Sequence, residues 1–117
     1  MLDMQQAKCL QSIRGEKGGT LFAELTELLR REVPVRVHEL TQHAAAQNGP
    51  LLAQRAHALA GSCASLGGRQ MQAAARALES AADAADWAAV PVRLAVLKES
   101  WVRLNLALIA FEEGAIT

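Results

Sequence analysis

Apolar residues recur every three or four positions along most of this chain, which is the spacing of one face of an α-helix. The repeat is most regular toward the C-terminus, where the steps alternate between three and four residues through Trp87, Val90, Leu94, Leu97, Trp101, Leu104, Leu108 and Phe111. This pattern predicts a long helix with its apolar seam inside a bundle. Asp86 stands before the seam as a candidate N-cap, and Pro91 falls near the first turn, where proline is tolerated.

Three more long helices are predicted upstream. The first starts at Thr20, a suitable N-cap, and carries apolar residues at helical spacing, namely Leu21, Leu25, Leu28 and Leu29. Pro34 disfavours a helical residue before it, so we expect a kink near Val33. The motif "NGP" ends this helix and starts the next, which runs to about Leu66 and stops at a glycine pair. The third helix spans about 69–82.

A shorter helix that begins at Asp3 is expected at the N-terminus, and it ends before the glycines of "RGEKGG". Short connections between consecutive helices favour antiparallel neighbours. The predicted fold is therefore all-α, an antiparallel up-and-down four-helix bundle with a short extra N-terminal helix. We expect one domain over residues 1–117, with the short helix and its turn in 1–19 and the bundle in 20–113.

The composition agrees with a helical fold and argues against nucleic acid and membranes as partners. The 117 residues are 51% apolar, only 3% aromatic and include no tyrosine, which favours helices over sheets. Twelve basic residues balance twelve acidic ones, so neither nucleic acid nor direct membrane contact is expected. We find neither a signal-like segment nor an apolar run of about 18 residues. Two cysteines are too few for a disulfide scaffold, which favours a reducing cytoplasm.

One histidine lies apart from the apolar stripes. In the helix over 51–66, the predicted core residues form a stripe whose members all lie within about 40° of one direction: Leu52, Ala56, Leu59, Cys63 and Leu66. His57 lies about 140° from that stripe and Gly61 about 180° from it, so both are predicted to face solvent. Glycine inside a helix costs about 1 kcal/mol relative to alanine. Gly61 therefore indicates that something must approach closely beside the histidine.

Small and polar side chains surround His57 in this projection. Gln54 and Ser65 flank its outer side, and the alanines at 53, 60 and 64 are expected to form a low surface around the ring. Such a surface would let another protein dock over the histidine. The candidate docking residues are therefore Gln54, Ala58, Ala60, Gly61, Ala64 and Ser65.

The chemistry available to one exposed imidazole is limited. Its neutral form predominates near pH 7 and is a nucleophile that can accept a phosphoryl group and return it. A hydrolase would need a second acid or base, an oxyanion site or a metal, and none is evident near His57. His38 and His43 are five residues apart and do not share a helical face, so no metal site is expected. Cys63 lies on the inner stripe and is interpreted as a small apolar residue. A carrier histidine fits better than a complete active site.

The segment "HALAGSCASLGG" at 57–68 resembles the helix motif of histidine-containing phosphotransfer (Hpt) domains in two-component signalling. That motif reads roughly His-x-Leu-Lys-Gly-Ser, followed by small residues and Leu-Gly-Ala, and the matching positions here are His57, Leu59, Gly61, Ser62, Leu66 and Gly67. The likeness extends over nearly the whole chain. It implies a four-helix bundle with a phosphorylatable histidine exposed on its second long helix.

The resemblance implies a relay in which His57 takes a phosphoryl group through Nε2 from the aspartate of one receiver domain and gives it to another. Hpt domains have no kinase activity, so a phosphoryl carrier is expected rather than a turnover enzyme. The expected partners are receiver domains of a hybrid histidine kinase, of a response regulator, or of both. They would supply Mg²⁺, and no cofactor is expected in this chain. The chain also fits the soluble C-terminal domain of a membrane-bound hybrid sensor kinase, and we expect a monomer because the bundle already uses its apolar seams.

One position departs from the family pattern. Hpt domains usually carry a lysine three residues after the histidine, and this chain has Ala60 there. That lysine lies close enough to the histidine to help neutralise the phosphoryl group, and Arg55 and Arg69 are the nearest other cations. An alternative function therefore stays open: a docking module of the same fold that binds a receiver domain or another signalling protein without carrying phosphate.

Overall fold

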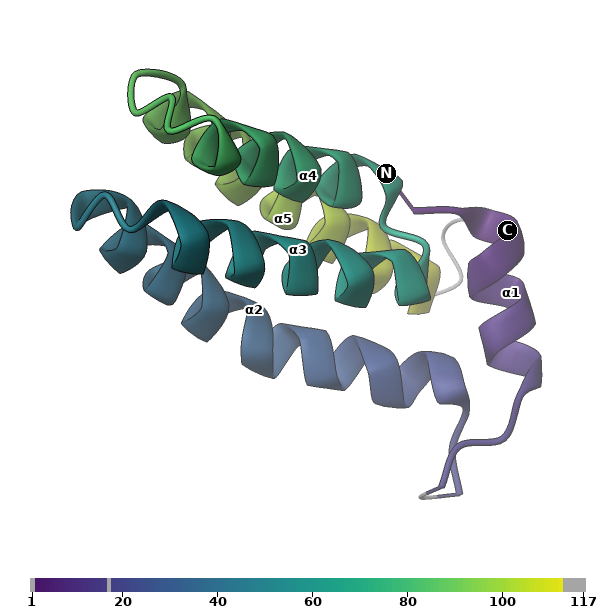
Figure 1. Ribbon diagram of the computed structural model, residues 1–117. Coiled ribbons are helices and arrows are strands. Elements are labelled where there is room, and N and C mark those ends of the chain that lie inside the picture. Colours follow the sequence, from purple (N-terminus) through teal and green to yellow (C-terminus); the bar gives the residue numbers. More distant parts are fainter. Residues whose placement is uncertain (1, 17, 113–117) are drawn as a thin grey trace.

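The computed structural model describes residues 2–16 and 18–112, so residue 113 of the predicted bundle lies outside the described part. It contains five helices: α1 (Met4–Ser12), α2 (Leu21–Ala45), α3 (Gly49–Leu66), α4 (Arg69–Asp83) and α5 (Ala89–Glu112). The all-α prediction is confirmed, and Figure 1 shows α3, α4 and α5 each running opposite to the helix before it. Among the described helices, none has the length and apolar character needed to cross a bilayer.

Helices α2 to α5 form a ring in cross-section. α2 packs against α3 and α5, and α4 packs against the same two helices from the other side. α3 and α5 lie diagonally across the ring, and their backbones do not approach each other closely. The outward faces of α3 and α5 therefore point away from each other, as Figure 1 shows with α3 in front and α5 behind.

Side-chain caps fix where the helices begin. Thr20 accepts the backbone N–H of Ala23 at 3.1 Å, as predicted. Asn48 accepts the N–H of Leu51 at 3.3 Å, so the glycine of "NGP" is the first residue of α3 rather than the end of α2. Asp86 accepts the N–H of Ala89 at 3.2 Å, which leaves Trp87 in the turn before α5, half-buried against the core.

The buried face of α2 does not include every leucine that follows helical spacing. α2 stays helical through Pro34 and changes direction near its middle (Figure 1). The side chains that it buries are Phe22, Thr26, Leu29, Val33 and Leu40. Leu28, one of the four leucines at helical spacing, is exposed. The helix carries apolar residues on two adjacent faces, and the face that includes Phe22 is buried because Phe22 meets Phe111 of α5, with ring centroids 4.8 Å apart.

α3 and α4 pack through alanines and join in a tight turn. The buried alanines of this pair are Ala53, Ala56 and Ala60 on α3, and Ala74, Ala75, Ala81 and Ala82 on α4. Side chains this small let two helices approach closely. α3 ends at Gly67, which has a φ of +88° and so takes the left-handed conformation that favours glycine. α4 begins two residues later.

α1 closes the end of the bundle beside that turn. The Gln6 side-chain amide donates to the carbonyl oxygens of Ala64 at 2.8 Å and Ser65 at 2.9 Å, which satisfies two acceptors at the C-terminus of α3. Asp3 pairs with Arg69 of α4 at 3.1 Å. The backbone N–H of Gln6, and then Arg69, lower the pKa of the Asp3 carboxyl below its ordinary value. α3 is therefore held at this end and presents its middle turns to solvent.

Candidate functional site

His57 lies in the middle of α3 with its side chain 76% exposed. One residue of the neighbouring helix contacts the ring. Both carboxylate oxygens of Glu79, on α4, approach the ring nitrogen Nδ1, at 3.1 and 3.2 Å. Glu79 itself is half-buried, with 26% of its side chain exposed, so it is more constrained than a free surface carboxylate.

This contact assigns the tautomer of the imidazole. A carboxylate only accepts hydrogen bonds, so the Nδ1 that faces Glu79 carries the proton. In the neutral ring, the lone pair is then on the other nitrogen, Nε2. His57 is thus placed with an exposed nucleophilic nitrogen and with a carboxylate fixed at the opposite side of its ring.

The space beside the ring is open. A Cβ built on Gly61 would meet no atom within 4 Å, so packing inside the bundle does not explain this glycine. The hydroxyl groups of Ser62 and Ser65 donate to the carbonyl oxygens one turn earlier, those of Ala58 and Gly61, both at 3.2 Å. These short side chains are therefore turned onto their own helix, and the surface around His57 stays low.

The predicted docking residues divide into two groups. Gln54, Ala58, Gly61 and Ser65 are exposed, and Ala64 is half-buried. The prediction is wrong for Ala60, which is only 3% exposed, and for Ala53 of the expected low surface, which is 6% exposed. Both alanines belong to the α3–α4 contact. A helical projection shows the direction of a side chain but not how closely the next helix approaches, and here α4 covers that flank.

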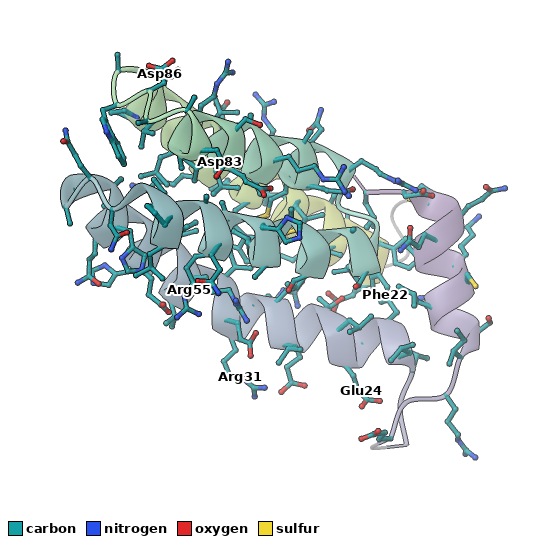
Figure 2. The ribbon with its side chains drawn as sticks, in the orientation of Figure 1. Phe22, Glu24, Arg31, Arg55, Asp83 and Asp86 are labelled. Atoms are coloured by element: carbon teal, nitrogen blue, oxygen red, sulfur yellow. The ribbon has the colours of Figure 1, made fainter. Side chains whose placement is uncertain are left out.

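Positively charged side chains lie on the other flank of α3. A groove between α2 and α3 is lined by Arg31, Glu32, Val35, Arg36, Glu39 and Arg55, and Figure 2 labels Arg31 and Arg55 on the same side of the bundle. Arg36 pairs with Glu32 at 3.3 Å. Among the described residues, neither Arg31 nor Arg55 makes an ion pair. Arg69 is held by Asp3 instead.

The other candidates take structural roles. Cys63 is buried, and burial raises the pKa of its thiol to about 12 although Arg36 opposes the shift. It is therefore not a nucleophile at neutral pH. The described residues contain no cluster of three or more histidine, cysteine or carboxylate side chains that would hold a metal ion.

Glu79 is not among the site residues predicted from the sequence, although its distance from the turn signals it. The α3–α4 turn is centred on the pair Gly67 and Gly68. In an antiparallel helical hairpin, residues about equally far from the turn lie at the same level. His57 and Glu79 satisfy this condition, and Glu79 follows the buried Leu78 on the flank of α4.

Comparison with known proteins gives the same family as the motif. The model of the Hpt domain family matches residues 24–113, which include all of α3, α4 and α5. Searches of curated proteins and of solved structures found no match. The matched region contains His57, Gly61 and Glu79 and spans most of the chain. The chain therefore belongs to the Hpt domain family, which serves histidine phosphotransfer in two-component phosphorelays.

Proposed function

We propose that His57 is the phosphoryl carrier of this domain, accepting the group at Nε2 from the phospho-aspartate of one receiver domain and passing it to the aspartate of a second. The observation that carries the proposal is the hydrogen-bonded ring: Nδ1 lies 3.1 Å from a Glu79 oxygen, and Gly61 leaves the approach beside it open. No other group of the chain is needed as a reactant.

The transfer step balances with these groups. The Nε2 lone pair attacks phosphorus, a bond forms between nitrogen and phosphorus, and the bond from phosphorus to the aspartate oxygen breaks. The aspartate leaves as a carboxylate, and the proton on Nδ1 stays on the ring. The imidazole gains positive charge as the new bond forms, and the Glu79 carboxylate faces that charge from the opposite side of the ring. The return step to the second receiver domain runs in reverse.

The receiver domain is proposed to dock over α3. The exposed docking residues around His57 offer short side chains, and the groove beside α2 offers Arg31 and Arg55. A receiver domain carries acidic residues and Mg²⁺ at its phosphorylation site, so these arginines complement the acidic rim of the partner. The metal belongs to the partner, and the Hpt chain contributes the nucleophile.

The alternative, a docking module that does not carry phosphate, has one observation in its favour. Ala60 replaces the usual lysine and is buried against α4, so the chain lacks that cation beside His57. Docking without transfer would need only the exposed surface of α3 and its groove. The two functions differ in whether phosphate reaches His57, not in whether a receiver domain binds.

Phosphoryl transfer from a phosphorylated receiver domain tests this directly. We expect acid-labile phosphate on the wild-type chain, measured by intact mass, and none on His57→Gln. The matched control is His38→Gln, because His38 is also an exposed histidine, on α2, and this variant should be phosphorylated normally. Receiver binding is measured in parallel. A wild-type chain that binds the receiver domain but never gains phosphate would replace the carrier with the docking module.

A further inference from the structure

The outward face of α5 is apolar along the helix, in addition to its buried face. Five of the eight large apolar side chains that are exposed in the described part of the chain lie on it: Val92, Val96, Val102, Leu106 and Ile109, each 39–62% exposed. We call these five residues the outer strip. A helix that is apolar on both sides is usually covered on both sides. The strip points away from α3, so whatever covers it leaves His57 free.

The order of residues along this face is symmetrical. Steps of four, three, four, three and four residues connect Val92, Val96, Glu99, Arg103, Leu106 and Ala110. Alternating steps of three and four are the seam of two helices packed side by side. The order of steps is the same in both directions along the helix. The two charged residues lie in the middle, with apolar residues on both sides of them.

The two charges select the orientation of a second copy of α5. In a parallel pair, Glu99 would face Glu99 and Arg103 would face Arg103, which is repulsive. In an antiparallel pair about a two-fold axis, Glu99 faces Arg103 of the second copy twice, and Val96 faces Leu106 twice. Glu99 and Arg103 pair at 2.8 Å within one chain and are 62% and 60% exposed. Their free sides are therefore available to a second copy.

We propose that α5 is a homodimer interface in which two copies pack antiparallel, with the two-fold axis between Glu99 and Arg103. A two-fold interface must be self-complementary, and the symmetrical order of this face meets that condition. α5 has 24 residues, so it is about 36 Å long. One helix pair of this length is near the lower limit of about 1,200 Å² for specific interfaces, so the dimer is reversible and depends on concentration. The bundle itself uses only the buried seam of α5, so the outer face of this helix is available to a second copy, contrary to the expected monomer.

The mass of the chain in solution tests the proposal. Sedimentation velocity between about 1 μM and about 1 mM covers the range of a weak dimer, with reductant present because Cys9 is exposed. We expect the wild-type mass to rise from 12.5 kDa toward twice that value. Leu106→Glu should raise the dissociation constant at least tenfold. Val35→Glu on α2 is the matched control, since Val35 is 58% exposed and Leu106 is 62% exposed, and it should dimerise as the wild type does.

Charge exchange tests the orientation. Glu99→Arg alone should weaken the dimer, and Glu99→Arg combined with Arg103→Glu should restore it, because an antiparallel pair again places opposite charges together. Both residues are exposed, and circular dichroism verifies that the variants fold. A wild-type chain that stays at 12.5 kDa throughout overturns the proposal. So does a dimer that survives Leu106→Glu. A double exchange that remains monomeric overturns the antiparallel arrangement.

Discussion

The exposed side of α3 and the outer strip of α5 are two solvent-facing helix surfaces of opposite character. α3 presents one imidazole among short side chains, with Gly61 open beside it. α5 presents branched aliphatic side chains such as Val102 and Leu106. A relay must release each partner, which favours a small surface with little apolar burial. The apolar strip favours a contact that lasts longer. The difference shows that exposure alone does not identify a functional surface, whereas the chemistry of the exposed side chains does.

The largest difference between the two surfaces should appear in the rate of phosphoryl transfer when a bulky side chain replaces Gly61 on α3. Gly61→Phe places a ring where the receiver domain must approach His57, and we expect phosphoryl transfer to slow at least 100-fold. Val102→Phe adds the same ring to α5 and should leave the transfer rate unchanged. Single-turnover transfer from a phosphorylated receiver domain measures both. Equal rates for the wild type and Gly61→Phe would contradict the access argument.

Gly61→Ala separates access from stability. The added methyl group meets nothing within 4 Å, and alanine is better than glycine inside a helix by about 0.5–1 kcal/mol. We therefore expect this variant to unfold at higher denaturant concentration while its transfer rate falls far less than that of Gly61→Phe. A destabilised Gly61→Ala protein would mean that the bundle itself requires the glycine.

A smaller effect is expected from removing the charge that faces the His57 ring. In Glu79→Gln, the amide oxygen still accepts the Nδ1 proton but the carboxylate charge is lost. A hydrogen bond to a charged group contributes about 1.5–3 kcal/mol, and losing about half of it slows transfer about tenfold. Asp83→Asn, an exposed acidic residue one turn later on α4, is the control and should transfer normally.

Nitrogen NMR of the ring distinguishes positioning by Glu79 from general damage to the fold. We expect the Nδ1–H tautomer to dominate in the wild type, to be retained in part in Glu79→Gln and to lose its preference in Glu79→Ala. A purely structural role for Glu79 would change the stability of all variants and leave the tautomer ratio of His57 as it is. That result would remove Glu79 from the site.

The features that sequence predicted well are those fixed by local chemistry. Thr20 caps α2 because its hydroxyl reaches a backbone N–H three residues away, and Gly67 ends α3 because its backbone turns left-handed. The seam of the last helix follows from spacing along one helix, and its members from Val90 to Phe111 are buried or half-buried. None of these features depends on where another helix lies.

The features that sequence missed depend on how two helices meet. Ala60 has the projection of a surface residue, yet α4 covers it because alanines on both helices allow a close approach. Leu28 has the spacing of a core residue, yet the bundle buries the adjacent face of α2. Glu79 joins His57 only through the register across the α3–α4 turn. Contacts between helices determine whether these side chains are buried, exposed or paired. The projection of a single helix carries no information about such contacts.

The smallest effect should come from the arginines of the groove, which distinguish the α3 side from the α5 side by charge. Removing Arg31 and Arg55 together, as Arg31→Ala and Arg55→Ala, should weaken receiver binding a few-fold, because exposed charges contribute mainly to encounter with an acidic partner. The loss should be larger at about 0.01 M salt, where the screening length is about 30 Å, and nearly vanish at about 1 M, where it is about 3 Å. Calorimetric titration at both salt concentrations measures this. Arg93→Ala, which replaces an exposed arginine on α5, is the control and should leave the affinity for the receiver domain unchanged at both salt concentrations. The groove touches neither Nδ1 nor Nε2 of His57, so the transfer rate at saturating concentrations of the receiver domain should stay at the wild-type value. A fall in that rate would place these arginines beside the phosphoryl group instead of at the rim of the docking surface.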